Sequence, residues 1–343
     1  MKKKLHCFAV VLACILAVSM LFVSCAKKDS GSATTGDAKS GEKTFNLTLA
    51  HNMAEDHAVH IQLTSFANAV KEKSNGTINI RIIPNGTLGS EADTISQIQN
   101  GALDMAKVSA GTLGNFNNKW NALSVPYVFN NQQHYFSVMD GEIAQDLYNS
   151  TADDGFIGLM WLDSGARSFY TKNTPIHEPS DLKGLKIRTM DSQMAIDMMN
   201  ALGGSSVVMG YSDIYAGMQQ GVIDGAENNV TALRDHADVT GYYSFDEHTR
   251  IPDIVVISST TWNEMSDSQR QVMIDCAKQA SNDYKKAWAD FENQVIASVE
   301  GKVEFVRDVD IPAFQAACQS IYSNLQTSDP EVYAIVEKIQ NFK

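Results

Sequence analysis

Two arginines and two asparagines in the middle of the chain have the types and positions that bind an anion. Arg167 follows an apolar strand in DSGARSFY, and the strand ends of α/β domains commonly contact ligands. Arg188 lies inside the apolar segment LKIRTM, and GVIDGAENN places Asn228 and Asn229 after a glycine-bounded turn. A guanidinium group binds a carboxylate through two parallel hydrogen bonds and keeps its charge when dehydrated. Each arginine alone is typical of a surface ion pair, whereas the group together indicates a buried anion clamp.

Three histidines in HNMAEDHAVH raise the alternative of a metal site. His51, His57 and His60 would have to converge, and the spacing of the last two does place them on one helix face. We prefer the interpretation that these histidines lie at a strand end and in the polar first turn of the helix that follows. We expect His236 and His248 to have structural roles. The chain has no GxSxG, P-loop, HExxH or GxGxxG motif. We therefore expect neither catalysis nor a cofactor.

The charge balance argues against nucleic acid as a partner. The chain has 343 residues, with 40 Asp and Glu against 27 Lys and Arg and a formal net charge of −13. Binding to phosphates requires a basic face that releases counterions, which an acidic protein of this kind does not offer. The length allows two domains, each large enough for a core of its own.

The N-terminus predicts export. Lysines at positions 2–4 precede an uncharged apolar run over 7–18, the pattern of a signal peptide. The ending LFVSC resembles a bacterial lipobox, although Phe22 stands where leucine is usual. We expect residues 1–24 to be a lipoprotein signal peptide and Cys25 to carry a lipid that anchors the protein in the cell envelope, in the periplasm. A plain secretory peptide cut nearby and a retained signal anchor are the alternatives.

The next segment predicts a flexible tether over 25–43. From 26 to 43 it has no aromatic and no large aliphatic side chain, so burial cannot offset the entropy of ordering it. The folded body then begins near Thr44. Its only cysteines, Cys276 and Cys318, lie at apolar positions of predicted helices, which favours two buried thiols over a disulfide.

The body alternates strands with helices, which predicts an α/β fold. Apolar or alternating patterns predict strands at 45–51, 77–84, 103–109, 156–162, 185–190, 205–209 and 254–259. Apolar faces predict helices at 59–70, 91–99, 193–202 and 211–220. The opening strand–helix order favours a parallel, doubly wound lobe. From 267 to 298 neither Pro nor Gly interrupts the apolar steps of three and four, which favours one helix of about 50 Å across both lobes over two stacked helices.

The segment 158–229 closely resembles the solute-binding proteins of TRAP transporters, the DctP family. GAR, LKGLKIR, ALGGSS, GYSDIY and QGVIDGAEN occur in the family's order and spacing, and NGTLGSE, VPYVF and the long helix extend the similarity over 44–343. The resemblance implies a two-lobed periplasmic binding protein that closes around an organic acid and delivers it to the membrane subunits of a TRAP permease, without catalysis. We expect lobe I at 44–165 with about 254–293, and lobe II at 166–253 with about 294–343.

The resemblance also assigns roles to single residues. Arg188 matches the arginine that pairs with the ligand carboxylate, and Arg167 matches a second, supporting arginine. Asn228 matches the amide that holds the ligand from the same lobe. Glu91 lies where the family contacts polar parts of the ligand, and Tyr211 where an aromatic ring commonly covers it. The weaker candidates, from strand ends and loops facing the cleft, are Asn52, His57, Ser109, Trp161 and Phe169.

The identity of the acid is less closely specified. The segment YYSFDEHTRIPDIVVIS resembles family members assigned to hexuronates and related sugar acids. Several polar groups suit ligand hydroxyls, and the ring of Tyr211 suits the C–H face of a sugar. A C4 dicarboxylate is the alternative within the family, and it would need a second cation, from Arg250 or a lysine. A metal-binding lipoprotein and an envelope hydrolase are the alternatives from other classes.

The lipobox interpretation predicts the behaviour of Cys25→Ser. Without the thiol there is no acceptor for the lipid, so the variant should appear in the soluble fraction or accumulate as uncut precursor. Fractionation of cells followed by mass measurement of the N-terminus checks this. Membrane attachment and processing identical to the parent would exclude the lipobox.

Overall fold

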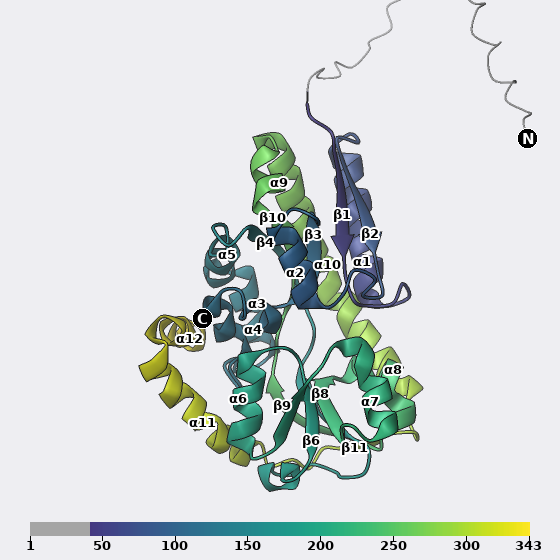
Figure 1. Cartoon of the computed structure of the whole chain (residues 1–343), viewed down its shortest axis with the longest axis vertical. Helices are drawn as coiled ribbons and strands as arrows, with labels where there is room; N and C mark the ends of the chain where they lie inside the picture. Colours follow the sequence, from purple (N-terminus) through teal and green to yellow (C-terminus); the bar gives the residue numbers. More distant parts are fainter. Residues whose placement is uncertain (1–41) are drawn as a thin grey trace, which may run out of the picture. The chain divides into compact units, whose positions relative to one another are not determined.

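Two mixed β-sheets form the centre of the protein, which is described by a computed structural model over residues 42–343 (Figure 1). The signal segment, Cys25 and the tether up to residue 41 lie outside the described residues. The first sheet has the order β2-β1-β3-β10-β4. Its strands are β1 (Phe45–Ala50), β2 (Ile78–Ile83), β3 (Met105–Ser109), β4 (Phe156–Leu162) and β10 (Asp253–Ser258).

The second sheet has the order β11-β9-β5-β8-β6-β7. Its strands are β5 (Arg167–Thr171), β6 (Lys186–Thr189), β7 (Ser205–Val208), β8 (Gly225–Asn229), β9 (Tyr242–Thr249) and β11 (Glu304–Val306). The chain passes between the sheets after β4 and returns after β9, so each sheet contains strands that are distant in sequence.

The sheets are not wholly parallel, unlike the lobe that the opening pattern predicted. β1 pairs in parallel with β2 and β3, as expected, but β10 pairs antiparallel with β3 and β4. In the second sheet β5 is antiparallel to both β8 and β9. Only residues 250–252 join β9 of the second sheet to β10 of the first.

The predicted helices form close to the expected residues, and others join them. The predicted ones are α1 (Ala58–Lys73), α2 (Glu91–Gln99), α6 (Gln193–Leu202) and α7 (Ile214–Gln220), the last preceded by the short η3 (Tyr211–Asp213). α11 (Ile311–Ser328) is the helix expected around Cys318. Those without a sequence prediction are α3 (Ala110–Leu113), α4 (Gln132–Asp140), α5 (Glu142–Asn149), α8 (Leu233–His236), α9 (Ser259–Glu264) and α12 (Pro330–Asn341). None of the helices between residues 42 and 343 combines the length and the hydropathy that a membrane-crossing segment requires.

The long helix is continuous, as predicted. α10 (Asp267–Ser298) begins at a capping box in which Ser266 and Gln269 each accept a hydrogen bond from the other's backbone N–H. It packs on α1 and β4 beside the first sheet, and on α8 and η4 (Val230–Ala232) beside the second. Cys276 on this helix and Cys318 on α11 are both buried and unpaired.

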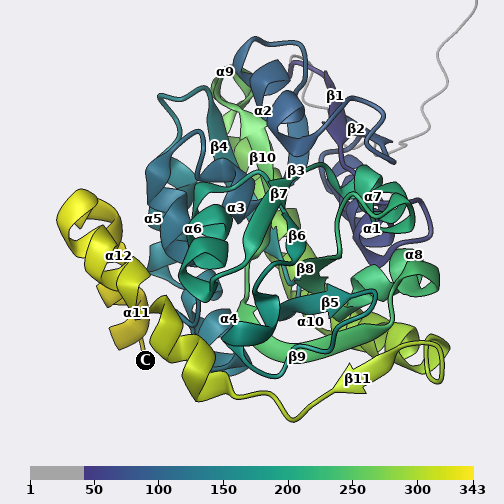
Figure 2. The same cartoon turned by 60° about the horizontal axis from the view of Figure 1, so that its bottom comes forward.

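The C-terminal helices join structures from both sheets (Figure 2). α11 packs on α6 and β9, whereas α12 packs on η1 (Asn118–Ser124) and α5. A single cluster of buried apolar side chains accordingly includes Val108 of the first sheet, Phe169 of the second and Phe314 of α11. The boundaries proposed for the two lobes stay a prediction.

The pairing of β5 with β8 predicts a strict requirement for glycine at position 225. A Cβ atom there would lie 2.4 Å from the carbonyl oxygen of Tyr170. Since the clash is with backbone, Gly225→Ala should lower the free energy of unfolding by about 1–3 kcal/mol. The measurement is the urea unfolding midpoint.

Gly210→Ala is the matched control, because its φ of −60° suits alanine and its nearest neighbour would lie 3.4 Å away. We expect it to stay within about 0.5 kcal/mol of the parent. Equal stability of the two variants would show that β5 and β8 are not packed this closely.

Candidate functional site

A cavity of about 520 Å³ lies between the two sheets and contains most of the candidate residues. Loops after β1 and β2, the start of α2 and the end of β3 contribute from the first sheet. β5, β6, β8 and the segment 208–213 contribute from the second. The candidates that line it are Asn52, His57, Glu91, Ser109, Arg167, Arg188, Tyr211 and Asn228. Residues from segments far apart in the sequence thus meet in one place.

Arg188 is a buried cation without an anionic partner. Its residue is only 4% exposed, and its Nε donates to the carbonyl oxygen of Met209 at 2.9 Å. It makes no ion pair with any residue in 42–343. Burial is the main cause of a lowered pKa for Arg188, and the charge of Arg167 adds to it. A dehydrated guanidinium group on the wall of a cavity is therefore available for an anionic ligand.

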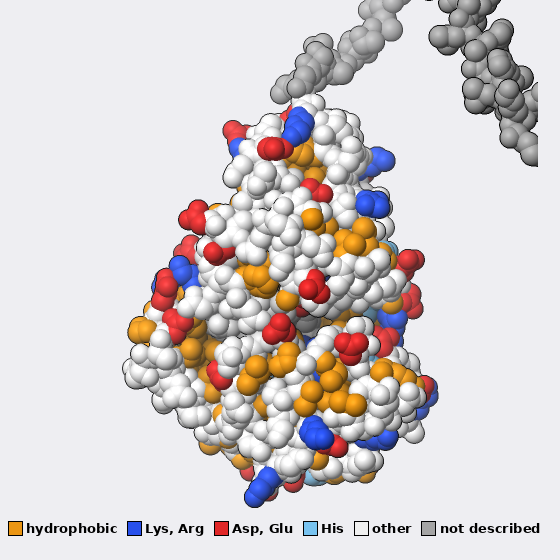
Figure 3. Space-filling model, in the orientation of Figure 1, with side chains coloured by type: hydrophobic (Ala, Val, Ile, Leu, Met, Phe, Trp, Pro, Cys, Tyr) orange, Lys and Arg blue, Asp and Glu red, His pale blue; other side chains and the backbone are white. Residues whose placement is uncertain are grey.

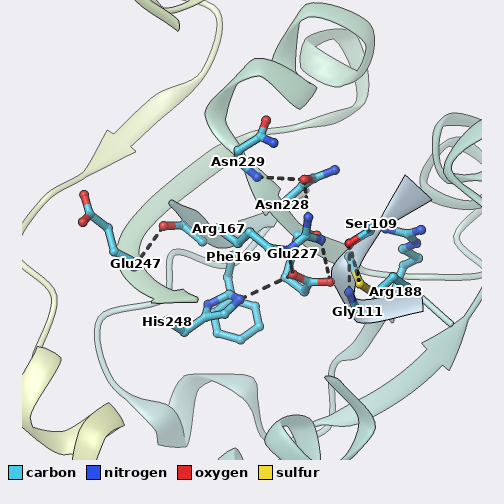
Figure 4. Close-up of polar contacts among 12 residues, drawn as sticks. Ser109, Gly111, Arg167, Phe169, Arg188, Glu227, Asn228, Asn229, Glu247 and His248 are labelled. Atoms are coloured by element: carbon cyan, nitrogen blue, oxygen red, sulfur yellow. Dashed lines mark hydrogen bonds and ion pairs between the residues drawn. The ribbon is translucent and has the colours of Figure 1, made fainter. Parts of the chain in front are cut away.

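Arg167 differs, because its charge is already neutralised. Its Nε and Nη2 donate to the two carboxylate oxygens of Glu227 at 2.7 and 2.9 Å, and its Nη1 donates to Asn228 Oδ1 at 2.7 Å (Figure 4). Burial favours neutral Glu227, but Arg167 and His248 outweigh it and lower the pKa of the carboxyl to about 2. Arg167 therefore holds Asn228 in place and has little charge left for a ligand.

The acidic side of this network extends to a histidine. His248 Nε2 lies 3.4 Å from Glu227 Oε2, and its Nδ1 lies 2.6 Å from Asp246 Oδ2. Burial opposes the charged imidazole, but Asp246 and Glu227 outweigh it and raise the pKa of His248 to about 9. The chain of four buried charged groups from Arg167 to Asp246 is thus balanced within the protein.

On the first-sheet side the carboxylate of Glu91 has four polar neighbours. Its Oε2 accepts from the backbone N–H of Ser109 and from Thr112 Oγ1, each at 3.0 Å. Its Oε1 lies 3.2 Å from Lys107 Nζ and accepts from Asn52 Nδ2 at 3.3 Å. Burial acts to raise the pKa of Glu91, but Lys107 and the hydrogen bonds outweigh it and lower it. Glu91 is therefore an oriented anion facing the cavity.

The remaining polar candidates border the same space. Asn228 Oδ1 is occupied by Arg167 and by the backbone N–H of Asn229, which leaves its amide nitrogen as the group to meet a ligand. The hydroxyl of Tyr211 donates to Asp235 at 2.9 Å, which orients the ring. Ser109 lies against Met190, whose sulfur is 3.7 Å from its hydroxyl (Figure 4). The two walls therefore already touch here.

Two weaker candidates do not line the cavity. Phe169 is fully buried opposite Glu227 on β8, where its ring packs on His248 and Phe314. Trp161 lies on β4, the edge strand, and its indole N–H donates to Asp140 on α4 at 3.1 Å. Their positions near strand ends predicted that both residues face the cleft. Side chains alternate between the two faces of a strand, however, and packing determines which of them reach the cleft.

The three histidines do not form a metal site. His51 Nε2 and His60 Nδ1 lie 3.0 Å apart, whereas His57 caps α1 by accepting from the backbone N–H of Val59. Burial lowers the pKa of both His51 and His57 to about 3. Within 42–343 no group of three or more His, Cys, Asp or Glu side chains is placed to hold a metal ion. The metal alternative is therefore not supported.

The sequence analysis missed Lys107, Asp253 and Glu227. Lys107 is a buried cation in the apolar segment MAKVS, the same signal that drew attention to Arg188. Its Nζ lies 3.1 Å from Asp253. Arg250, considered as a second cation for a dicarboxylate, lines a separate cavity of about 340 Å³ and lies 3.5 Å from Glu247.

The surface charges are dispersed. On the face drawn in Figure 3, Lys and Arg side chains lie apart from one another rather than in a continuous basic patch. Such a face does not offer the basic surface that nucleic-acid binding requires.

Comparison with known proteins identifies relatives along most of the chain. The uncharacterized protein YiiZ of Salmonella typhimurium is 38% identical over 309 residues, which cover 88% of this chain and 93% of the relative. A TRAP periplasmic solute-binding protein from Anaerococcus prevotii, solved with bound α/β-D-glucuronate, superposes with a TM-score of 0.84 at 32% identity and covers 87% and 98% of the two chains. Another from Sulfitobacter, solved with β-D-galacturonate, gives 0.83 at 30%, with 86% and 99% covered.

The pattern of bacterial extracellular solute-binding proteins of family 7 matches residues 49–329. The two mixed sheets and the long helix are the periplasmic binding protein fold of these relatives. The chain therefore belongs to the DctP family, the solute-binding proteins of TRAP transporters.

Proposed function

We propose that this protein captures a hexuronate or a related sugar acid and delivers it to the membrane subunits of a TRAP permease. The observation that carries the proposal is Arg188, a buried guanidinium group without an anionic partner on the wall of the cavity. A carboxylate is the anion whose geometry matches its two terminal nitrogens, Nη1 and Nη2. Binding would replace the water that this cation has lost.

The rest of the cavity suits the hydroxyl groups of a sugar. Glu91 accepts hydrogen bonds, the amide nitrogen of Asn228 donates them, and Asn52 Oδ1 is a buried acceptor without a partner in the described chain. Tyr211 offers an aromatic face to the C–H groups of a ring. The relatives solved with D-glucuronate and D-galacturonate support this choice of ligand.

We also propose that capture closes the cavity. Arg188 and Asn228 belong to the second sheet, whereas Glu91 and Asn52 border the first. A ligand that contacts both walls stabilises the conformation in which the walls are closest, because only that conformation satisfies both sets of groups. The protein catalyses no reaction in this proposal, and the lipid on Cys25 holds it near the permease.

Arg188 gives the most direct test. Arg188→Ala should weaken binding of D-glucuronate or D-galacturonate by roughly 30- to 4,000-fold, since losing one partner of a buried charge pair costs ~2–5 kcal/mol. Arg188→Lys keeps the charge but not the paired donors, so it should recover only part of the affinity. Calorimetric titration measures both variants.

Arg81→Ala is the control for Arg188→Ala, because this exposed arginine on β2 lies outside the cavity. Removal of an unpaired buried cation should leave the ligand-free protein as stable as the parent, which circular dichroism during heating checks. Affinity within threefold of the parent in folded Arg188→Ala would move the carboxylate site elsewhere.

Closure has its own observable. Saturating D-glucuronate should reduce the radius of gyration measured by small-angle X-ray scattering, because the ligand favours the state in which the two walls approach. The same titration with Arg188→Ala should leave the scattering profile unchanged. A profile of the parent that is identical with and without bound ligand would contradict closure.

A further inference from the structure

Three cations line the main cavity among the described residues, and they differ in how much charge they can offer. They are Lys107, Arg167 and Arg188. Their availability depends on the carboxylates that already surround them, since a buried ion pair presents little net charge to a third group. The number of carboxylates that a ligand can bring into the cavity follows from this balance.

The charge of Lys107 is already neutralised by neighbouring carboxylates. Its side chain is 1% exposed, and its Nζ lies 3.2 Å from Glu91 and 3.1 Å from Asp253. One cation between two carboxylates gives this cluster a net charge of −1 when all three are ionised. Burial raises the pKa of Asp253, and even with Asp253 protonated Glu91 alone neutralises the lysine. The first-sheet wall is therefore neutral or negative.

The second-sheet wall offers one positive charge. Arg167 is neutralised by the bidentate pair with Glu227, so Arg188 is the unpaired cation. The other charged side chains that line the cavity are acidic, namely Asp93, Asp191 and Asp213. A first carboxylate of a ligand finds Arg188, whereas a second one would lose its water without gaining a cation.

We propose that the cluster of Glu91, Lys107 and Asp253 is a specificity filter that admits sugar acids with one carboxylate and rejects diacids of the same carbon skeleton. The proposal rests on the proposed function, in which Arg188 receives the carboxylate of the ligand. Glu91 and Asp253 accept hydrogen bonds from hydroxyls at the far end of a monoacid. At the same place a second carboxylate meets like charge, which is strongly unfavourable in a dehydrated site.

The test compares three ligands by calorimetric titration of the whole mature protein. D-gluconate and D-glucarate have the same open chain and differ in the carboxylate at C6, and D-glucuronate is a monoacid that also forms a ring. The protein should bind the better of the two monoacids at least about 100-fold more tightly than D-glucarate. A preference below tenfold would overturn the filter.

Two variants test the cause of the preference. Glu91→Gln removes one negative charge beside Lys107 with little change of volume, and it should reduce the ratio of the D-glucarate to the monoacid dissociation constant by about tenfold or more. Asp253→Asn should have the same effect when Asp253 is ionised, and the double variant should reduce the ratio further because Lys107 then becomes a free cation. Glu331→Gln is the matched control: it breaks a lysine–glutamate pair, with Lys119 at 2.9 Å, on the surface outside the cavity.

The ratio, rather than the affinity, is the decisive quantity, since Glu91→Gln also removes a hydroxyl acceptor and should weaken every ligand. If neither single variant lowers the ratio of the D-glucarate to the monoacid dissociation constant relative to Glu331→Gln, the shape of the cavity and not its charge excludes the diacid. The filter is then wrong. Equal binding of D-glucuronate and D-glucarate to the parent would refute the filter while the proposed function stands. Failure of all hexuronates, with another monoacid preferred over its own diacid, would refute the sugar-acid assignment while the filter stands.

Discussion

A buried guanidinium group that lacks a counterion is the constraint on which the rest of this structure depends. Dehydrating a charge costs several kcal/mol unless a partner replaces the water. In this protein Arg167 and Lys107 have such partners, and Arg188 does not. The ligand-free protein thus retains an unsatisfied cation, which the remainder of the fold must be stable enough to support.

That support comes from networks that fix neighbouring groups without competing for Arg188. Glu227, two residues before Asn229 on β8, is paired with Arg167. The same carboxylate lies next to His248, which in turn contacts Asp246. Glu91 is held by hydrogen bonds from α3 and the end of β3. Because Arg167 and Lys107 each have carboxylates beside them, the proposed function assigns the ligand carboxylate to Arg188 alone. The same distribution of charge underlies the proposed preference for ligands of low charge.

In the proposed function the two walls approach each other while the site residues stay oriented. Each wall belongs to its own sheet, and the connections between the sheets include the short segment 250–252 and the long helix α10. α11 and α12 pack on elements from both sides, and one apolar cluster includes residues of both sheets. In the proposed function a ligand that bridges Arg188 and the Glu91 cluster acts across this junction, so its binding energy would favour the closed conformation.

Local patterns in the sequence determined many of the elements. Apolar periodicity and the positions of Gly and Pro predict α2, α6, α10 and β4. These signals act over only a few residues. The importance of Arg188 also follows locally, since a cation inside an apolar strand must be buried. Polar strands such as β5, β8 and β9 carry no comparable apolar signal, and the antiparallel entry of β10 depends on a partner distant in the chain.

Only the tertiary structure decided which cations are free. Arg167 and Arg188 have the same chemistry, yet Glu227 neutralises one and leaves the other unpaired. Lys107 is neutralised by Glu91 and Asp253, which are 16 residues before it and far after it in the chain. Phe169 and Trp161 likewise lie outside the cavity, because they contact α11 and α4. Charge balance and side-chain direction depend on distances between segments, and the linear sequence does not contain those distances.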